Sequence, residues 1–430
     1  MKNEFDVVVV GSGAGGATVA RELSRRGQKV LILERGSNRP LSDSLSGIAA
    51  VGRERSVGEN LKSMTAHTVG GSTSVYFGVC KLPNAETFAK LRIDCSAELA
   101  EVRRELPIAE LPDEFLQPQS RLVRDAAREL GYTFRRHPML IDQSRCAGGA
   151  YSYAAKWNAR AYVDDALAHG ATLVAGAEVQ QVIVENGRAI GVVYRAGGGL
   201  LGRKTERVFA KRVVLAAGAL ATPKLLMDCG VQRIGERGFF CKPAIAVFGT
   251  VPGLNARDAF LGQLDCDLGN GLSMGDGAMN ASLFRLFMLA NRRWRHIFAH
   301  SSTVSIGILM NDEMSGRIRD DGRYYKRLKK EELEKLASGA AVARQILQRA
   351  GARDIFVTRP AAGIPGGVLR VDEELDQDLQ TKVKNLYVCD HSVVCDEKIT
   401  PTVLLICLAK RLARHLAAAR QPQMIREHAA

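Results

Sequence analysis

A glycine-rich turn between a buried strand and a helix constrains the fold of this 430-residue chain more than any other feature. The apolar run Val7–Val10 predicts a parallel strand, and a helical pattern of apolar residues follows the turn. Gly11 permits the tight turn, Gly13 lets a pyrophosphate approach the backbone, and Gly16 lets the helix pack on the strand. The free N–H groups at the start of this helix attract phosphate. The turn therefore predicts a nucleotide site formed by Gly11, Gly13, Ala14, Gly15 and Gly16.

The predicted second strand, Lys29–Leu33, is followed directly by an acidic residue, Glu34. A carboxylate at this point can accept a hydrogen bond from the ribose of a dinucleotide, and we assign Arg35 to the same site. Strand, glycines, helix, strand and acid in this register are typical of the Rossmann fold, which belongs to the α/β class. The register permits either NAD or FAD as the dinucleotide.

A second glycine loop follows a polar stretch, Ser37–Glu59, that we expect to be a loop with a short helix. Two glycines followed by hydroxyl side chains form a backbone cradle for a phosphate or for the edge of a flavin, with an ordinary turn as the alternative. His67, just before the loop, is either a cofactor neighbour or, as we favour, a structural histidine. The residues of this loop that we assign to the cofactor are Gly70, Gly71, Ser72 and Thr73.

The excess of basic residues, 60 against 46 acidic ones, gives a formal net charge of +14. Such a charge suits nucleic acid, an acidic partner or an anionic membrane surface. No nucleic-acid-binding motif accompanies it, so we expect no nucleic-acid partner. The nine cysteines are scattered without CxxC pairs, so we expect reduced thiols and no metal site. We expect a cytoplasmic protein, because the first strand leaves no room for a secretory signal and no apolar run is long enough to span a bilayer.

The rest of the chain alternates between predicted strands and helices. Asn186–Gly187 predicts a hairpin turn, and Thr222-Pro223 begins a helix after the strand Arg212–Ala219. Apolar spacing predicts a helix at Glu331–Ala350, with an inward face formed by Leu333, Leu336, Ala340, Ala343 and Leu347. Further strands are predicted at residues 171–174, 179–185, 189–195, 244–251, 303–309 and 385–390, and a last helix at 401–416.

One segment, Leu283–His300, combines apolar and basic residues in a helical pattern. The apolar face of the predicted helix comprises Leu283, Phe287, Ala290, Trp294, Ile297 and Phe298, and the opposite face carries Arg285, Arg292, Arg295 and His296. A basic amphipathic helix with a tryptophan suits a membrane surface or the entrance for a hydrophobic substrate. An ordinary helix packed on the core is the alternative, and peripheral membrane contact through residues 283–300 is a hypothesis.

Three segments of the chain resemble one protein family and occur in that family's order. They are the first glycine turn with Glu34, the sequence VVLAAGALATPKLL that ends at Leu226, and NLYVCDHSV at Asn385–Val393. Together they resemble the glucose–methanol–choline (GMC) flavin oxidoreductases. The resemblance implies a Rossmann-like FAD-binding domain of the GMC and glutathione-reductase type, with an interleaved α+β substrate or cap domain. It implies FAD-binding segments at residues 1–80, 151–238 and 371–430, a cap region at 81–150 and a substrate domain at 239–370.

The same resemblance implies FAD as the cofactor. It places Val179 by the adenine, the second glycine loop along the pyrophosphate and the flavin edge, and Asp390 and Ser392 beside the ribityl chain. The further cofactor-binding residues that it implies are Ala217, Gly218, Pro401 and Thr402.

The chain departs from the family pattern where the catalytic base is expected. Family members usually carry a histidine in a stretch read as HPGGT, and the matching stretch here, IPGGV, begins with Ile364. The second polar partner is usually Asn or His before a proline, and here Thr400 precedes Pro401. Isoleucine cannot take a proton, and threonine is a far weaker acid than imidazole, so ordinary alcohol oxidation is in doubt.

Several side chains are candidates to replace the missing base. His391 borders the implied cofactor segment, and we assign His391 and Thr400 as candidate catalytic residues. Cys389 and Cys395 flank the same turn, but we favour packing thiols because neither has a cationic neighbour in sequence. Lys156 is either a surface lysine or a cation that holds a carboxylate or an anionic flavin.

The predicted activity is a dehydrogenase in which a CH–OH or CH–CH group of an organic substrate gives a hydride to flavin N5, and C–C desaturation would need less help from a base. The amphipathic segment and the apolar Ile364 favour a hydrophobic, small-molecule substrate, and the electron acceptor is a quinone, a protein or oxygen. Redox-neutral or light-driven flavin chemistry is one alternative, and a catalytically degenerate flavin-binding partner protein is another. We expect the protein in the cytoplasm, with peripheral contact to the inner face of the membrane as the further hypothesis.

Overall fold

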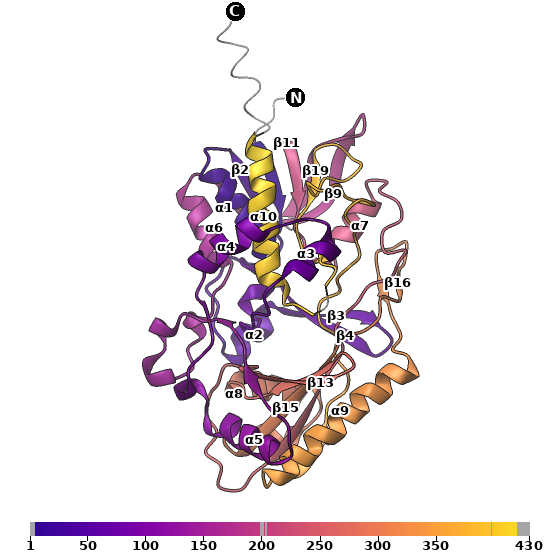
Figure 1. Ribbon diagram of the computed structural model, residues 1–430. Coiled ribbons are helices and arrows are strands. Elements are labelled where there is room, and N and C mark those ends of the chain that lie inside the picture. The colour runs from indigo at the N-terminus through magenta and orange to yellow at the C-terminus, as the bar shows by residue number, and fades with distance from the viewer. Residues whose placement is uncertain (1–4, 198–201, 203, 397, 419–430) are drawn as a thin grey trace, which may run out of the picture.

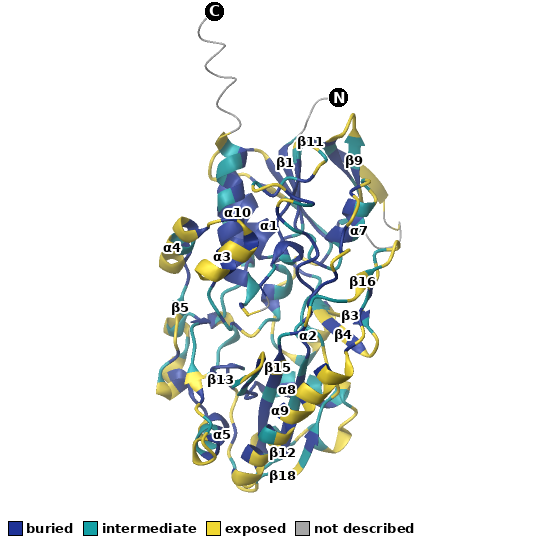
Figure 2. Cartoon of the chain, turned by 45° about the vertical axis from the view of Figure 1, so that its right-hand side comes forward, coloured by how far each residue is buried: buried dark blue, intermediate teal, exposed yellow. Residues whose placement is uncertain are grey.

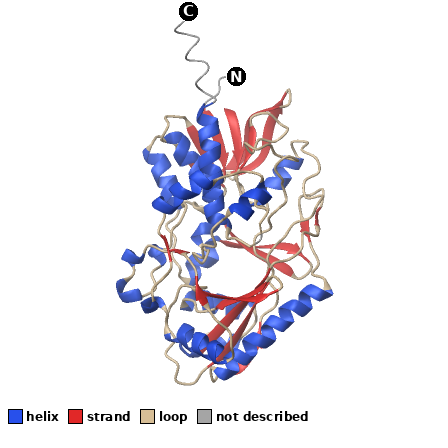
Figure 3. Cartoon of the chain, in the orientation of Figure 1, coloured by secondary structure: helices blue, strands red, loops and turns tan. Residues whose placement is uncertain are grey.

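The computed structural model describes residues 5–197, 202, 204–396 and 398–418, which are organised around two sheets (Figure 1 and Figure 3). The first is a seven-stranded sheet in the order β8-β2-β1-β11-β10-β9, with β19 also paired to β11. Strands β8, β2, β1, β11 and β19 run parallel, whereas β11, β10 and β9 pair antiparallel. The bounds are β1 Phe5–Val10, β2 Val30–Glu34, β8 Thr172–Ala175, β9 Glu178–Glu185, β10 Arg188–Ala196, β11 Lys204–Leu215 and β19 Leu386–Val388.

The predicted Rossmann core is confirmed. Helix α1 (Ala14–Ser24) follows β1 directly, and every one of its residues is buried. It packs against α6 (Arg160–Ala168) and against the last helix, α10 (Pro401–Ala418), which also contacts α4 (Ser96–Glu105). A parallel strand followed by a crossover helix must be covered on its faces, which explains why β1 and β2 read as continuous apolar runs. Figure 2 shows the buried residues concentrated in these strands and in α1.

The second sheet has six strands in the order β18-β12-β15-β14-β13-β6 and forms the α+β part of the predicted fold. Helix α9 (Lys330–Arg349) packs on it, and α5 (Pro118–Glu129) lies beside α9 (Figure 1). Leu336, Ala340, Ala343 and Leu347 face the core as predicted. Leu333 is 46% exposed, so its predicted inward position is wrong. It lies in the first turn of α9, where the helix extends past the strands (Figure 1).

The other strands and helices of the described residues are short. The strands of the second sheet are β6 Arg135–Arg136, β12 Ala244–Thr250, β13 Leu264–Gly269, β14 Leu272–Asp276, β15 Thr303–Met310 and β18 Arg353–Val357. The remaining helices are α2 Leu45–Val51, α3 Ala85–Leu91, α7 Thr222–Met227 and α8 Ala281–Ala290. Small two-stranded ribbons form between β5 Ile108–Ala109 and β7 Met139–Leu140, and between β16 Arg317–Ile318 and β17 Tyr324–Tyr325.

The short helix expected within Ser37–Glu59 is present as α2, but a hairpin begins where the rest of that stretch was expected to be a loop. Strands β3 (Gly52–Gly58) and β4 (Leu61–Ala66) pair antiparallel and connect the two halves of the molecule. Ser63 bridges to Ala362, and the Glu59 N–H donates to the carbonyl of Lys326 at 2.8 Å. Most residues of β3 are exposed, so the strand lacks the alternating apolar pattern by which strands are found in a sequence.

The predicted helix at Leu283–His300 is wrong beyond Ala290. Helix α8 ends in a Schellman turn, in which Arg292 has a φ of 57° and the Arg293 N–H donates to the Met288 carbonyl at 2.8 Å. Phe284 and Met288 form the buried face of α8. Core packing therefore stabilises the helix as far as this turn, and it does not stabilise a helix beyond the turn. None of the helices in the described ranges has the length and apolar character needed to cross a bilayer.

Candidate cofactor-binding and active site

The first glycine turn has the steric roles that its spacing predicted. Gly11 has a φ of 99°, and a Cβ added there would lie 2.2 Å from the carbonyl oxygen of Ala216. A Cβ on Gly16 would lie 2.1 Å from the oxygen of Gly11, so the close packing of helix on strand requires glycine. Gly13 is different, because a Cβ there would meet no protein atom within 4 Å. Gly13 therefore faces open space, as a pyrophosphate would require.

The start of α1 fits an anion. Its N-cap residue, Gly13, supplies no side-chain cap, and the first turn carries no acidic residue. The first backbone hydrogen bond of the helix runs from the Ala17 N–H to the Gly13 carbonyl at 2.9 Å. The N–H groups of Ala14, Gly15 and Gly16 precede it and have no acceptor within the helix, so they are free to bind a phosphate.

Glu34 and Ser12 organise the loop around this helix start. Glu34 is buried and accepts hydrogen bonds from the Ser12 N–H at 3.1 Å, the Ser12 hydroxyl at 2.7 Å and the Gly36 N–H at 2.7 Å. Burial raises the pKa of Glu34, although these donors oppose the shift. The predicted contact of Glu34 with a ribose stays a prediction. Ser12 was missed by sequence reasoning, because nothing local distinguishes it from an ordinary turn serine.

The second glycine loop lies against the first. The Gly70 N–H donates to the Ser12 hydroxyl oxygen at 3.1 Å, and a Cβ on Gly71 would lie 3.0 Å from the Cα of Gly13. Gly70 and Gly71 both have positive φ values, 93° and 57°. Ser72 and Thr73 follow in a short 3₁₀ turn, Gly71–Ser74. The structure thus brings the two predicted cradles, about 60 residues apart in sequence, to one place.

A third loop joins them at the carboxyl ends of β11 and β19. One carboxylate oxygen of Asp390 accepts from the Gly218 N–H at 2.9 Å and the Thr222 hydroxyl at 2.5 Å. The other accepts from the Ser392 N–H at 2.9 Å and the Ser392 hydroxyl at 2.6 Å. Asp390 therefore holds the turn at Gly218 and the turn at Ser392 in place. Both of its carboxylate oxygens already accept these hydrogen bonds, so a ribityl chain would be a further partner for them.

The other predicted cofactor residues lie on neighbouring elements. Ala217 precedes Gly218, where an added Cβ would meet no protein atom within 4 Å. Pro401 and Thr402 begin α10, and Val179 lies in β9 at the edge of the sheet. Arg35 follows β2 and lies near His67. Burial and then the charges of Arg35, Arg55 and Arg53 lower the pKa of His67 to about 4. The Nε2 atom of His67 is buried without a partner among the described residues, so the structural role that we favoured stays a prediction.

His391, the candidate base, lies beside the loop that carries Ile364. Its ring meets Phe240 edge-on at 6.0 Å between centroids and has a hydrogen bond with the backbone of Pro365. Burial and the charge of Lys242 lower the pKa of His391 to about 4, so the imidazole is neutral at neutral pH. Its Nδ1 is buried without a partner among the described residues. The chain thus has an imidazole next to the stretch in which the family histidine was expected.

Thr400 is engaged with the backbone of Lys81. Its hydroxyl oxygen accepts from the Lys81 N–H at 2.9 Å, and its own N–H donates to the Lys81 carbonyl at 3.2 Å. This pairing joins the start of α10 to the segment after the second glycine loop. We therefore propose that Thr400 positions this segment.

Replacing Thr400 by valine should separate a positioning role from a chemical one. Thr400→Val leaves the buried Lys81 N–H without its acceptor, so we expect the free energy of unfolding to fall by about 1–2 kcal/mol. The rate of flavin reduction by a saturating substrate should change by less than about threefold. Urea unfolding and stopped-flow reduction measure the two quantities, and a stable variant with a hundredfold slower reduction would restore a catalytic role.

The remaining candidates divide into an enclosed lysine and protonated thiols. Lys156 donates to the Tyr76 carbonyl at 3.2 Å and lies over the Tyr153 ring at 4.7 Å, so the surface-lysine interpretation is wrong. Burial lowers the pKa of Lys156 to about 8, with the charge of Asp43 acting in the opposite direction. Burial raises the pKa of Cys395 to about 11 and that of Cys389 further. Both thiols are protonated at neutral pH, as the packing interpretation predicted.

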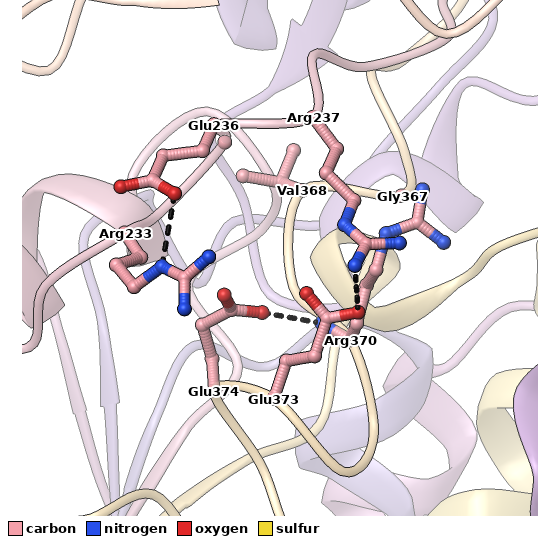
Figure 4. Close-up of a pocket in the computed structure, with 9 residues that line it drawn as sticks. Arg233, Glu236, Arg237, Gly367, Val368, Arg370, Glu373 and Glu374 are labelled. Atoms are coloured by element: carbon pink, nitrogen blue, oxygen red, sulfur yellow. Dashed lines mark hydrogen bonds and ion pairs between the residues drawn. The ribbon is translucent and has the colours of Figure 1, made fainter.

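A small polar pocket is lined in part by Gly367 and Val368, the last residues of the IPGGV stretch (Figure 4). Arg233 pairs with Glu236 at 2.9 Å, Arg237 pairs with Glu373 at 3.0 Å, and Glu374 accepts from the backbone N–H of Arg370 at 3.0 Å. These charges largely balance one another, and we assign the pocket no ligand. No group of three or more potential metal ligands comes together in the described part of the chain.

The fold and this site define a dinucleotide-binding flavoprotein. The chain belongs to the GMC oxidoreductase family, since the family model described as "GMC oxidoreductase" matches residues 5–239. The family resemblance, the fold and FAD as the cofactor are thereby confirmed. When bound, FAD would lie on Gly13, which faces open space, and on the N–H groups of the first turn of α1, with the Gly70–Thr73 loop packed beside them.

Three similar proteins illustrate the range of the family. An uncharacterised GMC-type oxidoreductase of Mycobacterium tuberculosis is 32% identical over 258 residues, which are 54% of this chain and 40% of that protein. A long-chain-alcohol oxidase of Arabidopsis thaliana is 25% identical over 410 residues, 82% of this chain and 54% of that protein. The chain thus spans about half the length of these relatives or less. Formate oxidase from Aspergillus oryzae has a similar fold, with a TM-score of 0.74, 14% identity and coverage of 97% of this chain and 98% of that chain.

Proposed function

We propose that this protein is an FAD-dependent dehydrogenase that oxidises a small organic molecule with His391 as the proton acceptor. The observation that carries the proposal is the convergence of the three cofactor loops with a neutral imidazole beside the loop of Ile364. Bound FAD supplies a hydride acceptor at flavin N5. The protein's part is to bind and orient the substrate, exclude water and remove the hydroxyl proton.

We further propose a hydrophobic substrate, such as a long-chain alcohol. The buried Phe240 ring packs against His391, and Ile364, next to the Pro365 that contacts His391, stands where other family members place a polar base. The likeness to a long-chain-alcohol oxidase points in the same direction. Apolar chains of this kind partition into bilayers, so we also propose that the protein works as a peripheral membrane protein.

Anaerobic absorption spectra test the proposed function directly. The purified flavoprotein is mixed in the dark with short alcohols, sugars, long-chain alcohols and isoprenoid alcohols. We expect the oxidised flavin band to bleach with long-chain donors, and reoxidation by oxygen or by a soluble quinone then identifies the acceptor. A band that no donor bleaches would contradict the proposal and favour redox-neutral, light-driven or regulatory alternatives.

His391→Ala should slow flavin reduction by about 100-fold while the protein keeps its flavin, because the variant lacks only the proton acceptor. A base with a pKa of about 4 is unprotonated above that pH, so the wild-type rate should be flat at higher pH and fall below about pH 4. The variant should lose this fall. Stopped-flow absorbance at roughly pH 3.5 to 8 measures the rate of flavin reduction and its pH dependence in both proteins. Wild-type rates in His391→Ala would exclude it as the base.

A further inference from the structure

We infer that the segment Asn291–Phe298, here called the aromatic–basic loop, binds the surface of a bilayer that contains anionic lipids. The inference rests on the proposed function, which requires a hydrophobic substrate, and it names the surface that meets the membrane. The predicted amphipathic helix does not form there, so the contact has to be argued from a loop after the end of α8.

Two aromatic side chains of the aromatic–basic loop project away from the protein. Trp294 is 63% exposed and Phe298 is 85% exposed, more than any other large apolar side chain of the described residues. Exposing two aromatic rings to water is unfavourable unless something covers them. Tryptophan in particular prefers the interface between water and lipid headgroups, where its ring is buried and its N–H stays hydrated.

The charged side chains of the aromatic–basic loop are all basic, whereas an exposed carboxylate, Asp258, lies 3.9 Å from His300 just after the loop. Arg292 and Arg295 are exposed, and no ion pair within the described ranges neutralises either of them. The sequence contains no Asp or Glu between Gly277 and Asn311. Arginines next to exposed aromatic rings complement a surface that is negative outside and apolar beneath, which describes an anionic bilayer.

The aromatic–basic loop is held in place by the core, so its exposure is built in. The Schellman turn at Arg292 fixes its start, and the Asn291 side chain donates to the Phe287 carbonyl at 2.9 Å. Arg293 lies 4.4 Å above the Phe356 ring, which belongs to the buried cluster beneath α8. Because Arg293 occupies this ring, the neighbouring Trp294 is directed outward.

An acidic protein or a nucleic acid could also bind the arginines of this loop. Neither would contact the two exposed aromatic rings in the way that a bilayer does. Nucleic-acid surfaces stack bases on aromatic rings along a basic groove, and no nucleic-acid-binding motif accompanies this loop. The aromatic–basic loop instead exposes its two rings after the Schellman turn that ends α8, which suits shallow insertion between lipid headgroups. We therefore assign it to the bilayer.

Vesicle flotation of the FAD-loaded protein tests the inference. We expect the wild type to float with phosphatidylcholine vesicles that contain about 30% phosphatidylserine, and much less with phosphatidylcholine alone. Trp294→Ser/Phe298→Ser and Arg292→Gln/Arg295→Gln should each lower the bound fraction at least about tenfold. Matched controls at other exposed positions, Leu130→Ser/Leu333→Ser and Arg128→Gln/Arg323→Gln, should bind as the wild type does.

The outcomes separate this inference from the proposed function. Flavin bleaching by a donor dissolved below its critical micelle concentration needs no membrane, so it should be the same in all four variants. Equal flotation of the wild type and both loop variants, or no flotation of the wild type, overturns the inference even if the flavin bleaches. Loss of flotation that the controls share would also overturn it. Loss in the loop variants alone, with bleaching and thermal unfolding unchanged, supports it.

Discussion

Gly13→Val should yield a folded protein that has lost its FAD. A Cβ at Gly13 meets no protein atom within 4 Å, and its φ of −69° and ψ of −173° are extended values that valine adopts readily. The added methyl groups would occupy the open space at the start of α1, where we predict that the pyrophosphate binds. We expect the affinity for FAD to fall at least about 100-fold, because the phosphates lose their approach to the free N–H groups. The ratio of the flavin absorbance at roughly 450 nm to the protein absorbance at roughly 280 nm measures this loss.

A neighbouring glycine supplies the matched control for this prediction. In Gly16→Ala the new Cβ would lie 2.1 Å from the Gly11 oxygen, so the helix has to move away from β1. That variant should unfold at a lower temperature both with and without FAD. Gly13→Val should instead keep the thermal midpoint of the FAD-free wild type. A yellow Gly13→Val protein with wild-type affinity would show that the cofactor does not approach α1 at this residue.

The elements near the cofactor could be predicted from the sequence because their causes are local. Buried parallel strands read as apolar runs, and Gly16 is required by a backbone contact within the same turn, whereas the contact that requires Gly11 is with the distant Ala216. The hairpin β3–β4 was missed because its exposed strand has no apolar period. The end of α8 at Ala290 was missed because the helical pattern continues in sequence while the buried cluster that fixes the helix ends.

The candidate active site was less accessible to sequence reasoning, because contacts between distant segments define it. Nothing in the sequence places His391 beside Pro365 or Phe240, and the expected exposure of Lys156 was wrong for the same reason. The buried hydroxyl of Ser12, which joins the first glycine loop to the second, has no local signal either. Burial changes the chemistry of each of these groups, and burial is a property of the tertiary structure.

Lys410→Met should destabilise the protein, because Lys410 is a buried lysine that pairs with two carboxylates. Lys410 is buried in α10, and its Nζ lies 3.1 Å from Glu22 and 2.8 Å from Glu105. Removing the ammonium group takes one partner from each carboxylate, while Glu22 keeps Arg26 and Glu105 keeps Arg21. We expect the free energy of unfolding to fall by about 2 kcal/mol, the typical cost of losing hydrogen bonds between charged groups. Urea unfolding at pH 7 measures it, and Lys330→Met, at an exposed lysine that contacts Glu334, is the control.

The pH dependence of Lys410→Met identifies the cause. Burial opposes ionisation of Glu105, but hydrogen bonds from Lys410 and Tyr162 and the charge of Arg21 lower its pKa to about 2. In the unfolded chain the pKa of a glutamate is about 4.3. Glu105 therefore stabilises the folded wild type above that pH, and this contribution is lost as the pH falls toward about 2. Without Lys410 the pKa of Glu105 rises toward its ordinary value. The deficit of the variant should therefore be largest at neutral pH and shrink between about pH 4.5 and 3. A deficit that stayed constant over this range would instead point to altered packing of the lysine's aliphatic chain.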